Sequence, residues 1–222
     1  MLGMRVNTSR IYSPLDLVLI FEQQAEALAA SLSHVPFNSL YTSDLKRALS
    51  TAKVLHSALC EAQVTPPCSL HVTSTLREQN FGVAEGTKIV KKDKGLSLRA
   101  HYAKGLFPTL YARHENYPGG ESLQDVRSRA EVFVEETLMA FIKDSEEANR
   151  KLSIAGVVSH GIFIGELVAA LLRKGCGSGE GNTDNFRGMR NTAWTKLEVR
   201  VVPVIMVRLY FSRPCYIDAN DN

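Results

Sequence analysis

A histidine that directly follows an apolar, strand-like run is the strongest chemical signal in this chain. The run Val157-Val158-Ser159 leads into His160-Gly161. Open α/β sheets bind their ligands at the carboxyl ends of their strands, and a glycine there leaves room for a ligand to approach the backbone. A single histidine in such a place is more often structural, so its interpretation depends on the other motifs.

Arg47 is the second candidate, in the segment Ser43-Asp44-Leu45-Lys46-Arg47-Ala48. Its planar guanidinium can bind two phosphate oxygens at once, and the helix expected to start beside it adds N–H donors and a positive dipole end. On its own, this segment is typical of an exposed helix. Beside the other motifs, it indicates an anion site.

Two further segments, Leu76 to Gly86 and Gly119-Gly120-Glu121-Ser122, follow in order along the chain. Taken together, the four motifs resemble the histidine phosphatase superfamily, the phosphoglycerate mutase-like clan, from about Ser13 to Val199. Within that clan, the first of these segments and Pro118 to Leu123 are most similar to the fructose-2,6-bisphosphatase-like and broad-specificity phosphatases.

The resemblance implies a covalent phosphatase mechanism. In the family, a histidine at the end of the first strand attacks phosphorus, a carboxylic acid protonates the leaving oxygen, and water then releases phosphate. By this likeness His160 is the second histidine of the pair, Arg47 a phosphate ligand and Glu78 the general acid. Ser122 is either close to the pocket or purely structural. No metal and no organic cofactor is implied.

Basic residues gather between positions 88 and 113, where the single acid is Asp93. Family members use this part of the chain to cover the active site and to choose substrates. The resemblance therefore implies a small basic cap over residues 87–118, in which Lys91 and Lys92 select an anionic substrate. The expected ligand is a small phosphorylated metabolite, with a sugar bisphosphate as the finer prediction. The alternative is an ordinary solvated face.

The likeness also marks a gap at the start of the chain. The family's first motif is Arg-His-Gly-Glu-Thr, with an Asn seven residues beyond its Arg, and Asn7 matches that Asn as a phosphate ligand. Counting back places the nucleophile at Met1, and the one Arg-His pair, Arg113-His114, precedes Glu115 where the motif needs Gly. We therefore expect a chain that lacks the first strand and the nucleophile and is inactive as given.

Two other interpretations stay open. One is a pseudoenzyme that uses Arg47, His160 and the basic cap to bind an anionic metabolite or a partner. The other is the product of a misjoined or unspliced exon, because Leu17 to Phe21 replaces the motif that usually opens the first helix of the family, beside an intact Gln24-Ala25.

Hydrophobic spacing predicts an α/β alternation around these motifs. Helices are expected over 13–32, 44–59, 121–142 and 162–172, and strands over 37–42, 70–76, 154–159, 194–199 and 204–211. Leu17 to Phe21 is also compatible with a short buried strand. The expected fold is a single domain over residues 1–222, a three-layer α/β/α sandwich around a mostly parallel sheet, with the first strand absent.

Composition limits the partners. The chain has 222 residues, of which 45% are hydrophobic, and its net charge of +3 is too mild to require nucleic acid. Its four cysteines have no C-x-x-C spacing, and no apolar stretch is long enough to span a membrane. We expect a cytoplasmic protein, and the sequence does not fix its oligomeric state.

Overall fold

The computed structural model describes residues 14–63, 67–150, 152–176, 192–201 and 205–211. In chain order the helices and strands are α1 (Pro14–Leu32), β1 (Ser39–Ser43), α2 (Lys46–Glu61), β2 (Ser69–Thr73), β3 (Ile89–Val90), α3 (Leu98–Ala103), β4 (Phe107–Pro108), α4 (Leu123–Phe133), α5 (Met139–Glu147), β5 (Ala155–Val158), α6 (Gly161–Cys176), β6 (Thr195–Val201) and β7 (Ile205–Phe211).

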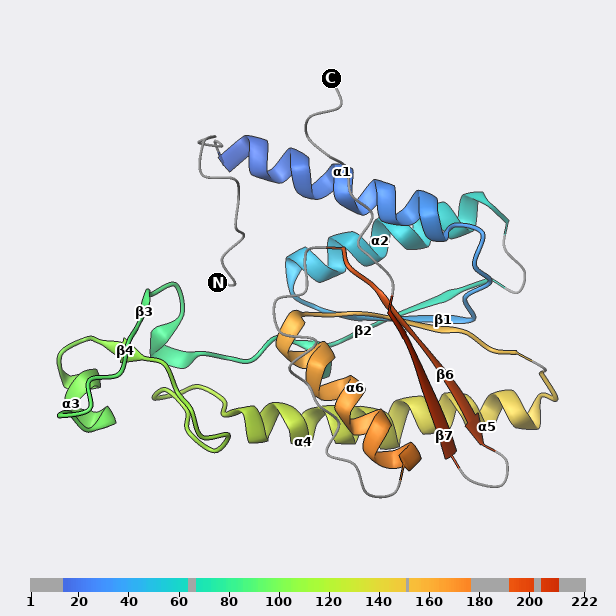
Figure 1. Cartoon of the computed structure of the whole chain (residues 1–222). Coiled ribbons are helices and arrows are strands. Elements are labelled where there is room, and N and C mark those ends of the chain that lie inside the picture. The colour runs from blue at the N-terminus through green and yellow to red at the C-terminus, as the bar shows by residue number, and fades with distance from the viewer. Residues whose placement is uncertain (1–13, 64–66, 151, 177–191, 202–204, 212–222) are drawn as a thin grey trace.

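Three parallel strands form the central sheet, in the order β2-β1-β5 (Figure 1). β1 pairs with both neighbours, and Leu40 lies opposite Leu70 of β2 and Gly156 of β5. Since the three strands run in the same direction, their carboxyl ends meet at one edge of the sheet. Ser43, the last residue of β1, and His160, just after β5, therefore lie at that same edge.

Helices cover both faces of this sheet, with α1 and α2 on one face and α4, α5 and α6 on the other (Figure 1). Successive residues of a strand point to opposite faces, so β1 contributes to two cores. Leu40 packs in a cluster with Leu55 and Leu59 of α2, whereas Tyr41 packs against Phe133 of α4. The predicted α/β fold with helices around a parallel sheet is confirmed.

The first helix settles the one ambiguous segment of the sequence. α1 is continuous from Pro14 to Leu32, so the strand interpretation of Leu17 to Phe21 is wrong, and Ser13 lies outside the described residues. Among the described residues, none of the helices combines the length and the apolar character needed to cross a bilayer.

The longest predicted helix is interrupted by a wider turn. It begins at Leu123 and continues to Glu147, and residues Val134–Leu138 between α4 and α5 adopt π-helical geometry. A π-bulge accommodates extra chain within a helix and rotates the residues that follow it. Here both Val134 and Leu138 remain buried against the same core.

β6 and β7 form a separate antiparallel pair, with Val199 opposite Val207. The sequence predicts both as strands, and both are present. In the described part of the chain, this pair does not hydrogen-bond to the parallel sheet. β5 consequently pairs with β1 alone among the described residues.

The segment 87–118 lies outside the three layers, where β3, α3 and β4 form a small lobe (Figure 1). An aromatic cluster holds it together: Tyr117 packs against Tyr102 and Phe107, and its hydroxyl donates to the carbonyl of Pro108 at 2.8 Å. His101 is fully buried in this lobe. The role of the segment as a substrate-selecting cap stays a prediction.

An ion pair ties this lobe to the sandwich. Arg113 donates to the carboxylate of Glu166 on α6 at 2.7 Å, and it also reaches the carbonyl of Leu123 at 3.5 Å. The Glu166 side chain is only 5% exposed. A buried carboxylate needs such a partner, because an unpaired charge is costly away from water.

Candidate functional site

His160 and Arg47 meet at the carboxyl edge of the sheet. His160 follows β5, and Arg47 lies in the first turn of α2, which follows the neighbouring strand β1. Arg47 Nε donates to His160 Nδ1 at 2.9 Å, across 113 positions of sequence. The pairing of β1 with β5 therefore brings the two strongest sequence candidates into direct contact.

This contact fixes the tautomer of His160. A guanidinium can only donate, so Nδ1 must accept and the ring proton resides on Nε2. Nε2 lies 3.0 Å from Ser43 Oγ, which accepts that proton's hydrogen bond. Burial lowers the pKa of His160 to about 4, and the charges of Arg47 and Arg129 act in the same direction. His160 is thus a neutral donor at physiological pH.

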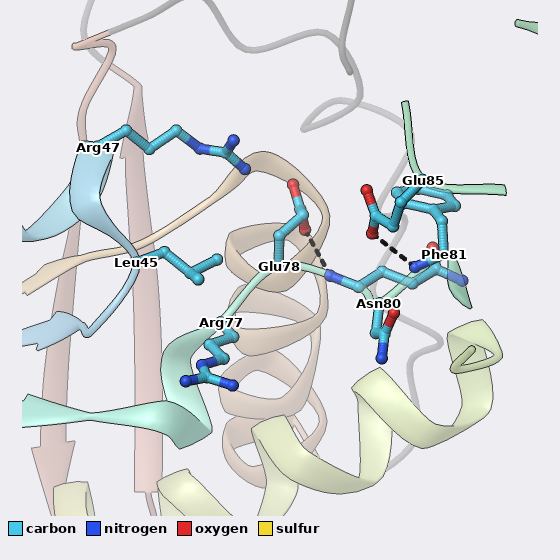
Figure 2. Close-up of a pocket in the computed structure, with 8 residues that line it drawn as sticks. Leu45, Arg47, Arg77, Glu78, Asn80, Phe81 and Glu85 are labelled. Atoms are coloured by element: carbon cyan, nitrogen blue, oxygen red, sulfur yellow. Dashed lines mark hydrogen bonds between the residues drawn. The ribbon is translucent and has the colours of Figure 1, made fainter. Parts of the chain in front are cut away.

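A pocket of about 350 Å³ opens beside this pair. Its lining residues are Leu45, Arg47, Arg77, Glu78, Gln79, Asn80, Phe81 and Glu85. Figure 2 shows the Glu78 carboxylate between the Arg47 guanidinium on one side and the Glu85 carboxylate on the other. Since Arg47 is held through Nε, its two terminal nitrogens stay available, and neither has a hydrogen-bond partner within the described residues.

The side chain of Glu78 reaches the N-terminus of α6 from a separate loop. Its carboxylate accepts the backbone N–H groups of Ile162 and Phe163, both at 3.3 Å, and that of Gln79 at 3.1 Å. The first N–H groups of a helix have no partner inside the helix, so an acidic side chain stabilises that end. Glu78 thereby connects the pocket to the helix that begins just after His160.

Arg77 contributes a second guanidinium to the lining, but Asp44 engages it. The two side chains form a paired contact, with Arg77 Nε at 2.7 Å from Asp44 Oδ1 and Nη2 at 2.5 Å from Oδ2. Arg77 holds the pKa of Asp44 below its usual range. Both side chains are substantially exposed, so the pair orders the pocket rim more than it stabilises the fold.

Arg129 holds the loop that carries Glu78 through hydrogen bonds to its backbone. It donates to the carbonyls of Thr75 and Arg77 at 2.5 Å and 3.1 Å, and to both carboxylate oxygens of Glu121 at 2.8 Å and 3.0 Å. Burial acts to raise the pKa of Glu121, but hydrogen bonds from Arg129 and Asn80 outweigh it and keep that pKa below its ordinary value.

Two glycines let the loop and its support touch through their backbones. A Cβ on Gly82 would lie 2.3 Å from the carbonyl oxygen of Pro118, and one on Gly120 would lie 2.7 Å from that of Asn80. Both distances are too short for any other residue. A backbone hydrogen bond joins the two segments here, because the N–H of Glu121 donates to the carbonyl of Asn80 at 2.7 Å.

Three of the remaining predicted site residues, Lys91, Lys92 and Ser122, are not among the residues that line the pocket. The Ser122 hydroxyl is the N-cap of α4, in a reciprocal capping box with Asp125. Lys92 pairs with Glu115 at 3.5 Å, and Lys91 is exposed. Asn7 lies outside the described residues.

Three contributors are missing from the sequence-based set of site residues: Ser43, Arg77 and Arg129. Ser43 and Arg77 belong to the quoted motifs, but nothing in those motifs separates their roles from those of their neighbours. Arg129 does carry a signal, because it stands three residues after Val126 on the apolar stripe of its helix. A charged residue at such a position needs a partner of opposite charge, and Glu121 supplies it.

A model of the histidine phosphatase superfamily, branch 1, matches residues 22–208 of the chain. The chain is 30% identical over 131 residues to the fructose-2,6-bisphosphatase TIGAR B of Danio rerio, covering 57% of this chain and 44% of that protein. It is also 30% identical over 137 residues to the fructose-2,6-bisphosphatase TIGAR of Xenopus laevis, covering 61% and 46%. The chain thus spans less than half the length of these relatives.

Solved structures share the fold. The native mycobacterial glucosyl-3-phosphoglycerate phosphatase superposes with a TM-score of 0.61 at 25% identity, covering 90% of this chain and 86% of that one. The complex of that phosphatase with inorganic phosphate gives a TM-score of 0.58 at 26% identity, covering 85% and 82%.

Proposed function

Since the chain belongs to branch 1 of the histidine phosphatase superfamily, we propose that its pocket binds the phosphoryl group of small phosphate esters. The observation that carries this proposal is the contact between Arg47 and His160. It anchors the guanidinium through one nitrogen and leaves two donors at the pocket. Two parallel donors match two phosphate oxygens, and His160 keeps the guanidinium in that orientation, since its single ring proton is already donated to Ser43.

In this proposal each residue has a distinct task. Arg47 stabilises charge on the phosphoryl oxygens, which is the main requirement of phosphoryl transfer, and His160, the predicted second histidine, holds the Arg47 guanidinium in place. Glu78 lies in the same pocket and is the carboxyl group that would give its proton to the leaving oxygen. Asn7 is a further proposed phosphate ligand.

Hydrolysis by a phosphohistidine also needs an attacking histidine. The 222-residue sequence contains no Arg-His-Gly tripeptide, and its one Arg-His pair, Arg113-His114, contributes neither residue to the pocket lining. Loss of a covalent nucleophile costs on the order of 10⁶ in kcat. We therefore propose that this chain binds phosphate esters without turning them over.

Calorimetry with orthophosphate tests the binding. We expect saturable binding by the full chain, and Arg47→Ala should weaken it by roughly 10- to 100-fold, the usual worth of hydrogen bonds to a charged group. Lys46→Ala is the matched control, because Lys46 is the exposed neighbour in the same helical turn and does not line the pocket. Hydrolysis of p-nitrophenyl phosphate should stay at the buffer rate.

Orthophosphate, sugar phosphates or vanadate at millimolar concentration should also raise the melting temperature, since they bind the folded state. If none of them shifts it, the chain has no phosphate site and the proposal fails. Hydrolysis of p-nitrophenyl phosphate by the native chain above the buffer rate would contradict the proposal that it binds esters without turning them over.

The finer prediction, a bisphosphate selected by Lys91 and Lys92, finds less support. Neither lysine lines the pocket, and Lys92 is paired with Glu115. Other residues must therefore contact the alcohol part of the ester.

A further inference from the structure

We propose that Glu85 determines the substrate class of this pocket. The ligand is a phosphate monoester whose alcohol part presents hydroxyl or ammonium donors and carries no second phosphate. This inference rests on the proposed function, because it takes the phosphoryl group to lie at Arg47.

Glu85 is positioned for this role by its own loop. Its Oε1 accepts the backbone N–H of Phe81 at 2.9 Å, which fixes the carboxylate at the pocket wall. Oε2 has no hydrogen-bond partner among the described residues, and the side chain forms no ion pair with them. Figure 2 shows this carboxylate facing Glu78, on the side away from Arg47.

The charges of the lining match a single phosphoryl group. Two arginines and two glutamates line the pocket, but Arg77 is engaged by Asp44. Arg47 is then the one lining guanidinium, in the described residues, whose terminal nitrogens are free for an anion. A second phosphate on the far side of the pocket would face Glu85 instead of a cation.

The basic lobe over residues 87–118 adds no cation to the pocket lining. None of its lysines or arginines is among the pocket-lining residues. Lys92 is held by Glu115, and Arg113 is held by Glu166. The cations that would bind a second phosphate are therefore elsewhere or already paired.

A fixed carboxylate has two effects on a ligand. It accepts hydrogen bonds from hydroxyl or ammonium groups, and such charge-assisted bonds are stronger than neutral ones. It also repels a second anion, and one unit of repulsion across a pocket partly open to water corresponds to roughly a five- to thirtyfold change in Kd. Both effects favour the same class of ester.

The test compares ligands that differ in the alcohol part. Calorimetry on the full chain would measure Kd for orthophosphate, sn-glycerol 3-phosphate, O-phosphoethanolamine and fructose 1,6-bisphosphate. We expect the native chain to bind the two monoesters more tightly than the bisphosphate. In Glu85→Gln, the ratio of the bisphosphate Kd to the glycerol phosphate Kd should fall by roughly five- to thirtyfold.

Glu85→Gln keeps the acceptor for the Phe81 N–H, so it changes the charge and leaves the loop bonded. Glu61→Gln makes the same change of charge at an exposed position outside the pocket and should leave the ratio unchanged. If orthophosphate fails to bind the native chain, the proposed function itself is wrong. If orthophosphate binds and Glu85→Gln leaves the ratio unaltered, only this inference is overturned.

Discussion

Arg47 and His160 fix each other's orientation through a single hydrogen bond. The guanidinium fixes the proton of His160 on Nε2, and the imidazole in return orients the guanidinium. Ser43 completes the arrangement, because its Oγ accepts from His160 and from the backbone N–H of Leu45. Because Ser43 takes the only ring proton of neutral His160, the histidine acts at the pocket by orienting the Arg47 guanidinium.

The buried, neutral state of His160 predicts a pH dependence of stability. Its pKa in the folded chain is about 4, below the ordinary value of 6.5, mainly because of burial. Its contribution to the free energy of unfolding is therefore fully present above pH 6.5 and is lost as the pH falls from 6.5 toward 4. Urea denaturation at several pH values measures this slope.

The variants isolate the histidine from the carboxylates that titrate in the same range. His160→Asn should flatten the slope between pH 6.5 and 4, whereas His34→Asn, at an exposed position, should leave it unchanged. An identical slope in His160→Asn and the native chain would show that another group is responsible.

The loop that carries Glu78 packs directly against the turn that supports it. The two segments approach so closely that Gly120 has no room for a Cβ between the backbones of Asn80, Phe81 and Gly82. The side chains of Arg129 and Glu121 also bond to this segment, at the carbonyl of Thr75 and the N–H of Asn80. The position of the pocket wall thus depends on backbone contact as well as on side chains.

Gly120→Ala should lower the free energy of unfolding by about 1–3 kcal/mol, because the new methyl group meets backbone atoms that cannot move aside. It should also weaken orthophosphate binding, since the loop must shift. Gly95→Ala is the matched control, because its Cβ would meet only the Asp93 side chain at 3.5 Å. Equal stability of the two variants in urea denaturation would refute the close approach.

Hydrophobic spacing predicts α1, α2 and the β5–α6 unit because these elements bury a regular stripe or run. The same reasoning does not place the end of β2, which stops at Thr73 before a 3₁₀ turn over Ser74–Leu76. It also does not predict the π-helical turn at Val134–Leu138, since the apolar residues remain at helical spacing. Short strands such as β3 are set by their partner, which lies far along the chain.

In the candidate site, too, some residues could be predicted from the sequence and others could not. Arg47, Glu78 and His160 belong to motifs whose order along the chain indicates a phosphate site, and all three lie around one pocket region. The prediction that Lys92 binds substrate rests on its charge and on the family resemblance of the segment, and the structure pairs it with Glu115. A sequence lists charges, but only the fold determines which of them neutralise each other.

The lobe over residues 87–118 is attached to the sandwich through a charged contact. Glu166 on α6 is almost fully buried, and Arg113 reaches it from the returning arm of the lobe. Removing only one partner of such a pair leaves an uncompensated charge inside the protein.

Arg113→Met should therefore lower the free energy of unfolding by about 1–3 kcal/mol, less than for a fully buried pair because Arg113 is 41% exposed. Adding Glu166→Gln should restore part of the loss. A double-mutant cycle in urea measures the coupling. Lys143→Met breaks an exposed pair with Glu147 and should change stability by less than about 0.5 kcal/mol; strictly additive effects of the two substitutions at 113 and 166 would contradict the coupling.

Because Glu78 bonds to the first N–H groups of α6, hydrogen exchange at the start of that helix can report on ligand binding in the pocket. If a bound ester draws the Glu78 carboxyl group away from the helix, the amide hydrogens of Ile162 and Phe163 lose their acceptor and should exchange faster with solvent deuterium. The amide of Ile164 is bonded to the carbonyl of His160 at 2.8 Å and serves as an internal reference. Ligand binding would thus be read as local deprotection of two adjacent amides within a protein that becomes more stable elsewhere.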